Sequence, residues 1–176
     1  MVELRVATTG ELVPRELVAL RLLMDSAFAG NFSNDDWDHT MGGLHVLAVA
    51  DGIAAHAAVV ERTLTAGDRS LRTGYVEGVA TAESHRSRGL GSMVMRRAGQ
   101  VILESYELGA LSTGVPDFFV SLGWEPWRGP TYANAPTGFV RTEEEDDTIF
   151  VMRTPATRDL DTTLPLACDW RSGDVW

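Results

Sequence analysis

The sequence predicts a mixed α/β (α+β) fold in one domain covering residues 1–176. Two observations lead to this class. A chain of 176 residues with 44% hydrophobic content supports one substantial core but not two. Apolar, β-branched stretches with strand character also alternate with stretches of helical periodicity. No apolar run approaches the ~20 residues that a membrane span needs, and the N-terminus lacks a signal-peptide profile, so we expect a soluble, cytoplasmic protein without membrane contact.

The first third of the chain predicts a strand followed by two helices. Residues 2–8 alternate like a strand, and Pro14 suits the first turn of a helix. The apolar face of that helix is marked by residues spaced three and four apart: Leu17, Leu20, Met24 and Phe28. Ser33, followed three residues later by Asp36, predicts the cap of a short helix through residue 39.

The middle of the chain predicts paired strands and one long helix. Residues 44–50 and 53–65 are joined by Asp51-Gly52, which favours a tight antiparallel hairpin. A turn at Gly67-Asp68 then leads to a strand over residues 71–81. The remaining expected elements are a helix over 89–106, a strand over 108–111, a helix over 116–122, and strands over 124–127 and 149–153.

The charge and cysteine content exclude several classes of function. The net charge is −10 and all fifteen basic residues are arginine, so a nucleic-acid polymer would be repelled. Acidity serves either solubility or the attraction of a cationic ligand. The acidic run at residues 143–147 predicts a solvated loop. Cys168 is the only cysteine and the four histidines are scattered, so we expect neither a disulfide framework nor a metal site.

Residues 86–91, Arg-Ser-Arg-Gly-Leu-Gly, are the most informative segment for chemistry. They lie between an expected strand and the start of the long helix. Glycines there allow main-chain amides to converge, and a helix N-terminus adds partial positive charge, so the segment predicts a pyrophosphate site. The order of glycines matches neither a dinucleotide-binding turn nor a P-loop, which disfavours nucleotide hydrolysis.

The pattern R-x-x-G-x-G, preceded by Val-Glu-Gly-Val-Ala at residues 76–80, resembles the acetyl-CoA motif of the GCN5-related N-acetyltransferases (GNAT). The resemblance implies a central mixed, mostly antiparallel sheet that is flanked by helices and splayed at the acetyl-CoA site. It also implies acetyl-CoA as cosubstrate. Val79, Ala80 and Thr81 would contact its pantetheine and acetyl groups. Its diphosphate would be wrapped by Arg86, Ser87, Arg88, Gly89, Leu90 and Gly91.

Segments along nearly the whole chain resemble aminoglycoside 2′-N-acetyltransferases in particular. The most specific is the ending Asp-Trp-Arg-Ser-Gly-Asp-Val-Trp, residues 169–176. The resemblance implies that the tail 154–176 contributes to the substrate site and that the carboxylate of Trp176 lies in it. The implied substrate contacts are Asn31, Asp36, Glu77, Gly78, Ser112, Glu144, Glu145, Asp174 and Trp176. The resemblance also implies a homodimer.

The resemblance also implies catalytic roles. Trp176 is an expected catalytic residue because its carboxylate would lie in the site. Glu77 is the expected general base, acting directly or through a water, and the Val79 amide is the expected oxyanion donor. A tyrosine that protonates the departing thiolate in relatives is replaced by Phe119. Water, Ser121 or Tyr132 could take over that role, or no enzymic acid is needed because a CoA thiolate is a stable leaving group.

Three alternatives remain open at the level of the sequence. Asn31 replaces an expected aspartate and glutamates replace aspartates near residue 145, so a kasugamycin-like drug without the deoxystreptamine ring is one alternative substrate. Another is a polyamine, a peptide N-terminus or a cell-wall amine. The third is a non-catalytic acetyl-CoA-binding module, for which Phe119 is the motivation.

Overall fold

The computed structural model describes residues 1–176 and contains two compact units. The first comprises Met1–Val60 and Val76–Gln100, and the second comprises Glu61–Tyr75 and Val101–Trp176. Three elements contribute residues to both units: β3 (Ile53–Ala66), β4 (Arg69–Thr81) and α3 (Leu90–Ser105). No helix is both long enough and apolar enough to span a bilayer.

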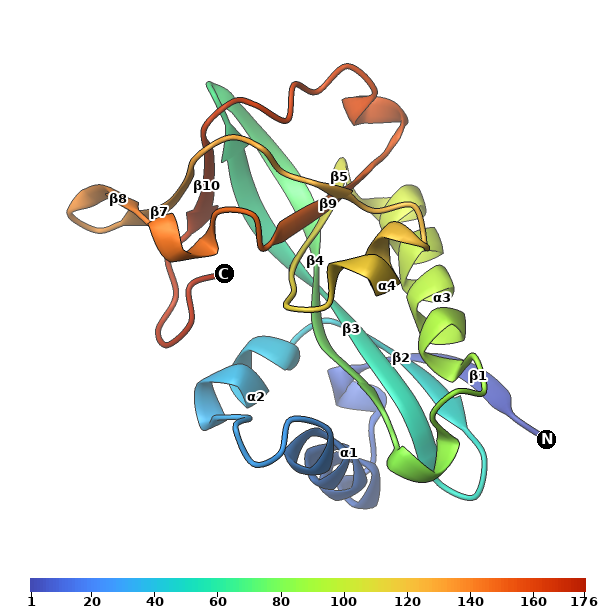
Figure 1. Ribbon diagram of the computed structural model, residues 1–176. Helices are drawn as coiled ribbons and strands as arrows, with labels where there is room; N and C mark the ends of the chain where they lie inside the picture. Colours follow the sequence, from blue (N-terminus) through green and yellow to red (C-terminus); the bar gives the residue numbers. More distant parts are fainter. The chain divides into compact units, whose positions relative to one another are not determined.

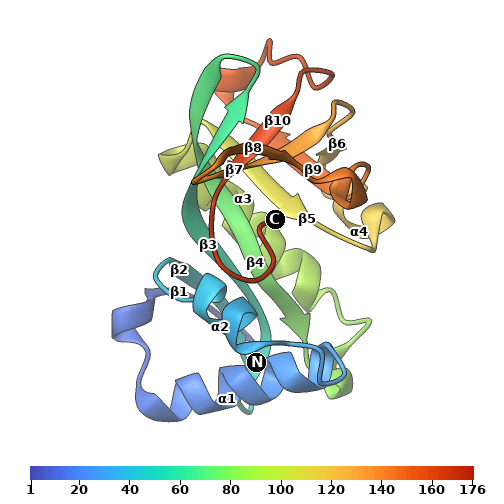
Figure 2. The ribbon, with the colours of Figure 1, turned by 90° about the vertical axis from the view of Figure 1, so that its left-hand side faces the viewer.

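In the first unit, β1 (Glu3–Thr8), β2 (Leu44–Val49) and residues 53–60 of β3 form consecutive antiparallel pairs. The helices α1 (Pro14–Ala27) and α2 (Asn34–Thr40) lie next to each other in both views (Figures 1 and 2). Short 3-10 turns at Thr9–Glu11 and Glu83–His85 complete the unit.

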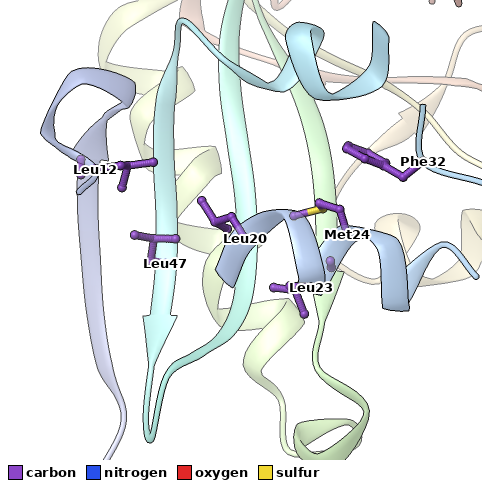
Figure 3. Close-up of a cluster of buried hydrophobic side chains, with 8 residues drawn as sticks. Leu12, Leu20, Leu23, Met24, Phe32 and Leu47 are labelled. Carbon is purple, nitrogen blue, oxygen red and sulfur yellow. The ribbon is translucent and has the colours of Figure 1, made fainter. Parts of the chain in front are cut away.

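The apolar face of α1 forms the core of the first unit. Leu20, Leu23 and Met24 are buried on that helix, and they share one cluster with Leu47 of β2 (Figure 3). Ala80 of β4 belongs to the same cluster, and Trp37 of α2 packs against it. The cluster therefore ties both helices of this unit to the strand that carries the predicted acetyl-CoA contacts.

In the second unit the strand order is β6-β9-β5-β4-β3-β10-β7-β8, with β4–β5 and β7–β10 parallel and the other described pairs antiparallel. The hairpin of β7 and β8 lies beside β10 in both views (Figures 1 and 2). Beyond β3 and β4, the bounds are β5 Leu108–Ser112, α4 Pro116–Val120, β6 Glu125–Pro126, β7 Thr131–Ala135, β8 Gly138–Arg141, β9 Ile149–Arg153 and β10 Leu166–Asp169.

The α/β class with a mixed, mostly antiparallel sheet and flanking helices is confirmed. Predicted ends differ from the observed ones by at most two residues for each expected element. Three strands were not predicted: β7, β8 and β10. The acidic run contains a single 3-10 turn at Glu143–Glu145, in which Glu143 and Glu144 are exposed.

Candidate functional site

The end of β4 departs from regular strand geometry at Gly78. This glycine has φ +56°, in the left-handed region, and a Cβ added to it would lie 3.1 Å from Cγ2 of Thr40. A left-handed glycine inside a strand is typical of a β-bulge, where the backbone turns a peptide group out of the ladder. Glu77, Gly78 and Val79 are all half-buried. The proposed base and oxyanion donor therefore flank one irregular backbone position.

Two buried histidines, which the sequence patterns did not single out, lie behind Gly78. His56 Nδ1 is 2.7 Å from the Gly78 carbonyl oxygen, and His56 Nε2 is 2.9 Å from His45 Nδ1. His45 Nε2 is 2.7 Å from the hydroxyl of Thr9. Burial lowers the pKa of His56 to about 3 and that of His45 to about 4. Both imidazoles are therefore neutral at pH 7.

The loop at residues 86–91 presents main-chain amides at the start of α3. Ser87 and Gly89 have positive φ values of 59° and 77°, so the backbone alternates in handedness before the helix. Such alternation points successive N–H groups toward one centre, where they form a concave anion-binding site. The first intrahelical bond here runs from Met93 N to Gly89 O at 2.9 Å, which leaves the first-turn amides without an intrahelical acceptor.

Side chains in this loop divide into exposed and buried groups. Arg86, Ser87, Arg88 and Gly89 are exposed, whereas the side chain of Leu90 is only 4% exposed. Leu90 can therefore face an anion only through its amide. The predicted diphosphate contacts fit this arrangement, because two exposed guanidinium groups adjoin the free amides.

Two predicted substrate contacts, Asn31 in the loop after α1 and Asp36 in α2, differ in their hydrogen bonding. Asp36 Oδ2 accepts a 2.7 Å hydrogen bond from Ser33 N, and the Ser33 hydroxyl accepts one from Asp36 N at 3.0 Å. This reciprocal pair is the capping box that the sequence predicts for α2. Asn31 is exposed in the loop before it. Asp36 thus has one carboxylate oxygen engaged in holding its helix.

In the second unit, Ser112 and Glu145 come together. The Ser112 hydroxyl donates to Glu145 Oε2 at 3.2 Å, and the Thr148 hydroxyl donates to the same oxygen at 2.7 Å. Glu144 beside them is exposed. Asp146 has a structural role, since it pairs with Arg141 and accepts from the amide of Thr131. The hydrogen bond from Arg141 is the largest cause that lowers the pKa of Asp146 to about 2.

The C-terminal segment is held by specific contacts. The indole of Trp176 is buried and donates to the Thr142 hydroxyl at 2.9 Å. Arg171 Nη2 donates to the main-chain oxygen of Trp176 at 2.7 Å, and Asp174 Oδ1 accepts from Trp176 N at 3.1 Å. The side chain of Trp176 is therefore part of the core, and its main-chain oxygen is held by Arg171.

Phe119, which replaces the expected tyrosine, and the two alternative acids Ser121 and Tyr132 all make contacts within the protein. Phe119 is 5% exposed and meets Phe118 and Trp124 edge to face, which is a core role. The Ser121 hydroxyl donates to the Phe118 carbonyl at 2.6 Å. Tyr132 lies half-buried under the guanidinium of Arg141. Trp127 nearby in sequence is also a core residue, since it is 1% exposed and its indole donates to the Leu164 carbonyl.

The structure assigns the predicted site residues to two groups. The first unit holds Asn31, Asp36, Glu77, Gly78, Val79, Ala80, Thr81 and residues 86–91, and the second holds Ser112, Glu144, Glu145, Asp174 and Trp176. The structure contains no cluster of three or more His, Cys, Asp or Glu side chains that could hold a metal ion.

Comparison with known proteins points to one family. Residues 16–127 match the family model described as an acetyltransferase (GNAT) domain. An aminoglycoside 2′-N-acetyltransferase of Mycolicibacterium fortuitum is 44% identical over 177 residues, covering 98% of this chain and 91% of that protein.

Solved structures share the fold at low sequence identity. A GNAT family N-acetyltransferase (YhbS) from Escherichia coli, in complex with CoA, has TM-score 0.68 and 14% identity, covering 97% of this chain and 89% of its own. Escherichia coli ElaA has TM-score 0.60 and 17% identity, with 87% and 100% coverage. A Brucella melitensis GNAT family acetyltransferase in complex with acetyl-CoA has TM-score 0.54 and 14% identity, with 71% and 84% coverage.

Proposed function

The chain belongs to the GNAT acetyltransferase family, and from this premise we propose that it transfers the acetyl group of acetyl-CoA to the 2′-amine of an aminoglycoside. The observation that carries the substrate class is the 44% identity, over nearly the whole of both chains, with an aminoglycoside 2′-N-acetyltransferase. Such acetylation removes a positive charge from the drug, and antibiotic resistance is its expected consequence in the cytoplasm.

The loop at residues 86–91 fits the diphosphate of acetyl-CoA. The free amides at the start of α3 supply hydrogen-bond donors, and Arg86 and Arg88 supply exposed positive charge in a chain of net charge −10. Val79, Ala80 and Thr81 offer main-chain groups along β4 for the pantetheine arm. Acetyl-CoA supplies an activated thioester, and the residues below act on the amine and the carbonyl.

The chemistry requires a neutral amine and a polarised carbonyl. Glu77 accepts a proton from the ammonium group of the substrate, directly or through a water, and the resulting neutral amine attacks the thioester carbon. The Val79 amide donates to the carbonyl oxygen as negative charge develops there. Holding amine and thioester together contributes much of the acceleration. With Phe119 in the core, water protonates the departing thiolate, whose negative charge is well tolerated on sulfur.

We propose, from the family resemblance, that a set of carboxylates binds the ammonium groups of a polycation. They are Asp36, Glu144, Glu145, Asp174 and the carboxylate of Trp176, with Ser112, Asn31 and the Gly78 backbone as polar contacts. The excess of acidic over basic residues attracts such a ligand from a distance. We also propose, on family grounds, that the enzyme acts as a homodimer.

The proposal is tested by assaying CoA release with a panel of amines. Aminoglycosides that carry a 2′-amine should support turnover, whereas close analogues with a 2′-hydroxyl should not. If only kasugamycin, a polyamine or a peptide is turned over, that compound is the substrate and the proposed substrate class is wrong. If acetyl-CoA binds but no amine releases CoA, the protein is a binding module.

A further inference from the structure

The hydrogen bonds behind Gly78 form a chain with one possible direction. A carbonyl oxygen only accepts, so His56 Nδ1 must carry the proton that it donates to Gly78 O at 2.7 Å. In a neutral imidazole the other nitrogen then accepts, so His45 Nδ1 donates to His56 Nε2 at 2.9 Å. His45 Nε2 in turn accepts from the Thr9 hydroxyl at 2.7 Å.

Every polar group in this series of hydrogen bonds has a partner. The Thr9 oxygen accepts from the amide of Gly42 at 2.9 Å, so each donor has an acceptor from Gly42 N to Gly78 O. His45 and His56 are both 0% exposed, so no solvent competes for their ring nitrogens. Burial lowers the pKa of both rings well below 7, which keeps them neutral. The hydrogen-bond partners then select the Nδ1–H tautomer of each ring.

The Gly78 carbonyl and the Val79 amide belong to the same peptide group. That group is planar and trans, because the structure has no cis peptide bonds, so its C=O and N–H point in opposite directions. A hydrogen bond that fixes the Gly78 oxygen toward His56 therefore fixes the direction of the Val79 N–H on the other side. Gly78 itself cannot impose this direction, since glycine rotates more freely than other residues.

We propose that His56, supported by His45 and Thr9, is a positioning residue for acetyl transfer: it clamps the 78–79 peptide so that the Val79 amide is aimed as oxyanion donor. This inference rests on the proposed function for its catalytic consequence. Successive hydrogen bonds that point the same way also polarise one another, which strengthens the Val79 N–H as a donor. The proposed donor thus depends on side chains of β2 and β3 that need not touch the substrate.

The first test measures the clamp without any substrate. Nitrogen NMR of the histidine rings should show Nδ1–H tautomers for His45 and His56 at pH 7, with both rings neutral. An Nε2–H tautomer at His56, or a cationic ring there, would overturn the proposal, because neither state has the required donor and acceptor arrangement. This outcome is independent of which amine is the substrate.

The second test compares two substitutions at one position. His56→Asn retains an N–H the same number of bonds from Cα as Nδ1, whereas His56→Leu is similar in size but has no donor. We expect kcat to fall about 10- to 100-fold in the leucine variant and to recover to within about threefold in the asparagine variant. The Kd for acetyl-CoA should stay within about twofold in both.

Controls separate positioning from loss of stability. Thr157→Val removes a buried hydroxyl that donates to the Glu107 carbonyl at 2.8 Å in the second unit, so it should lower stability and leave kcat unchanged. If His56→Leu does not fold, Thr9→Val tests the other end of the hydrogen-bond series, because it removes the hydroxyl that donates to His45 Nε2. A mixture of ring tautomers with a fall in kcat of about threefold or more supports the clamp. Equal kcat in all variants would overturn it, and absence of acetylation by the wild-type enzyme would instead refute the proposed function.

Discussion

At the scale of single residues, Gly78 determines what its neighbours can do. Its left-handed φ of +56° interrupts β4, and a side chain there would begin only 3.1 Å from Cγ2 of Thr40. Any other residue there would meet both backbone strain and a close contact with Thr40. The backbone between Glu77 and Val79 is therefore flexible, and surrounding groups must hold it in place.

Replacing Glu77 by glutamine should lower kcat for amine acetylation by about 100-fold, because the amide cannot accept the ammonium proton. The Kd for acetyl-CoA should be unchanged, since the proposed diphosphate contacts lie elsewhere. Stopped-flow or steady-state CoA release measures the first quantity and calorimetry the second. Unchanged turnover in this variant would remove Glu77 from the role of base.

Sequence patterns singled out some candidate site residues and missed others for identifiable reasons. Ser112 and Glu145 were predicted separately by family resemblance, and the structure brings them to 3.2 Å. The hydrogen bond between His45 and His56 was not predicted. The two histidines lie in different apolar strand stretches, and the sequence alone does not show that these strands pair with the two rings in contact. Each histidine alone suits an ordinary buried position.

At the scale of elements, the turn into α3 combines two sources of anion affinity. Alternating backbone handedness at Ser87 and Gly89 directs amides to one side, and the helix adds the partial charge of its N-terminus. The arginines Arg86 and Arg88 are exposed on the same short segment. Backbone and side chains thus contribute separately to binding of a diphosphate.

Substituting Arg88 by serine should weaken acetyl-CoA binding about 3- to 30-fold, and the loss should shrink as salt is raised, because an exposed charge is screened. Calorimetric titration at two ionic strengths measures both effects. Arg96, an exposed arginine within α3 itself, is the matched control, and Arg96→Ser should bind acetyl-CoA normally. An equal loss in both variants would show that net charge, rather than the turn, governs binding.

The elements that were missed depend on distant pairing. β10 is four residues long and pairs with β3 and β7, so its strand character comes from neighbours far away in sequence. β7 and β8 flank the turn at residues 136–137, but every residue of β8 is exposed, which removes the alternation that identifies a strand. Elements with strong local periodicity, such as α1, were predicted nearly to their ends.

At the scale of the whole molecule, the buried histidines couple folding to pH. Their pKa values of about 4 and about 3 in the folded protein lie below the ordinary value of 6.5. Between these values the unfolded chain binds protons that the folded chain excludes, so acid favours unfolding in this window. The carboxylate of Asp146, whose pKa is lowered to about 2, loses its contribution only at more acidic pH.

The free energy of unfolding should therefore fall as the pH is lowered from 6.5 toward 4, by up to about 1.4 kcal/mol per pH unit for each histidine. Urea denaturation at a series of pH values measures this slope. His56→Asn removes one of the two groups and should reduce the slope. A wild-type stability that does not change between pH 6.5 and 5 would contradict the burial of neutral imidazoles.

The most direct measurement is the position of the acetyl group in the product. The enzyme is incubated with acetyl-CoA and an aminoglycoside that carries several primary amines, and the product is assigned by NMR. We expect a single acetyl group on the 2′-nitrogen. Acetylation of a different amine would contradict the proposed regiochemistry, and the absence of any acetylated drug would contradict the proposed function itself.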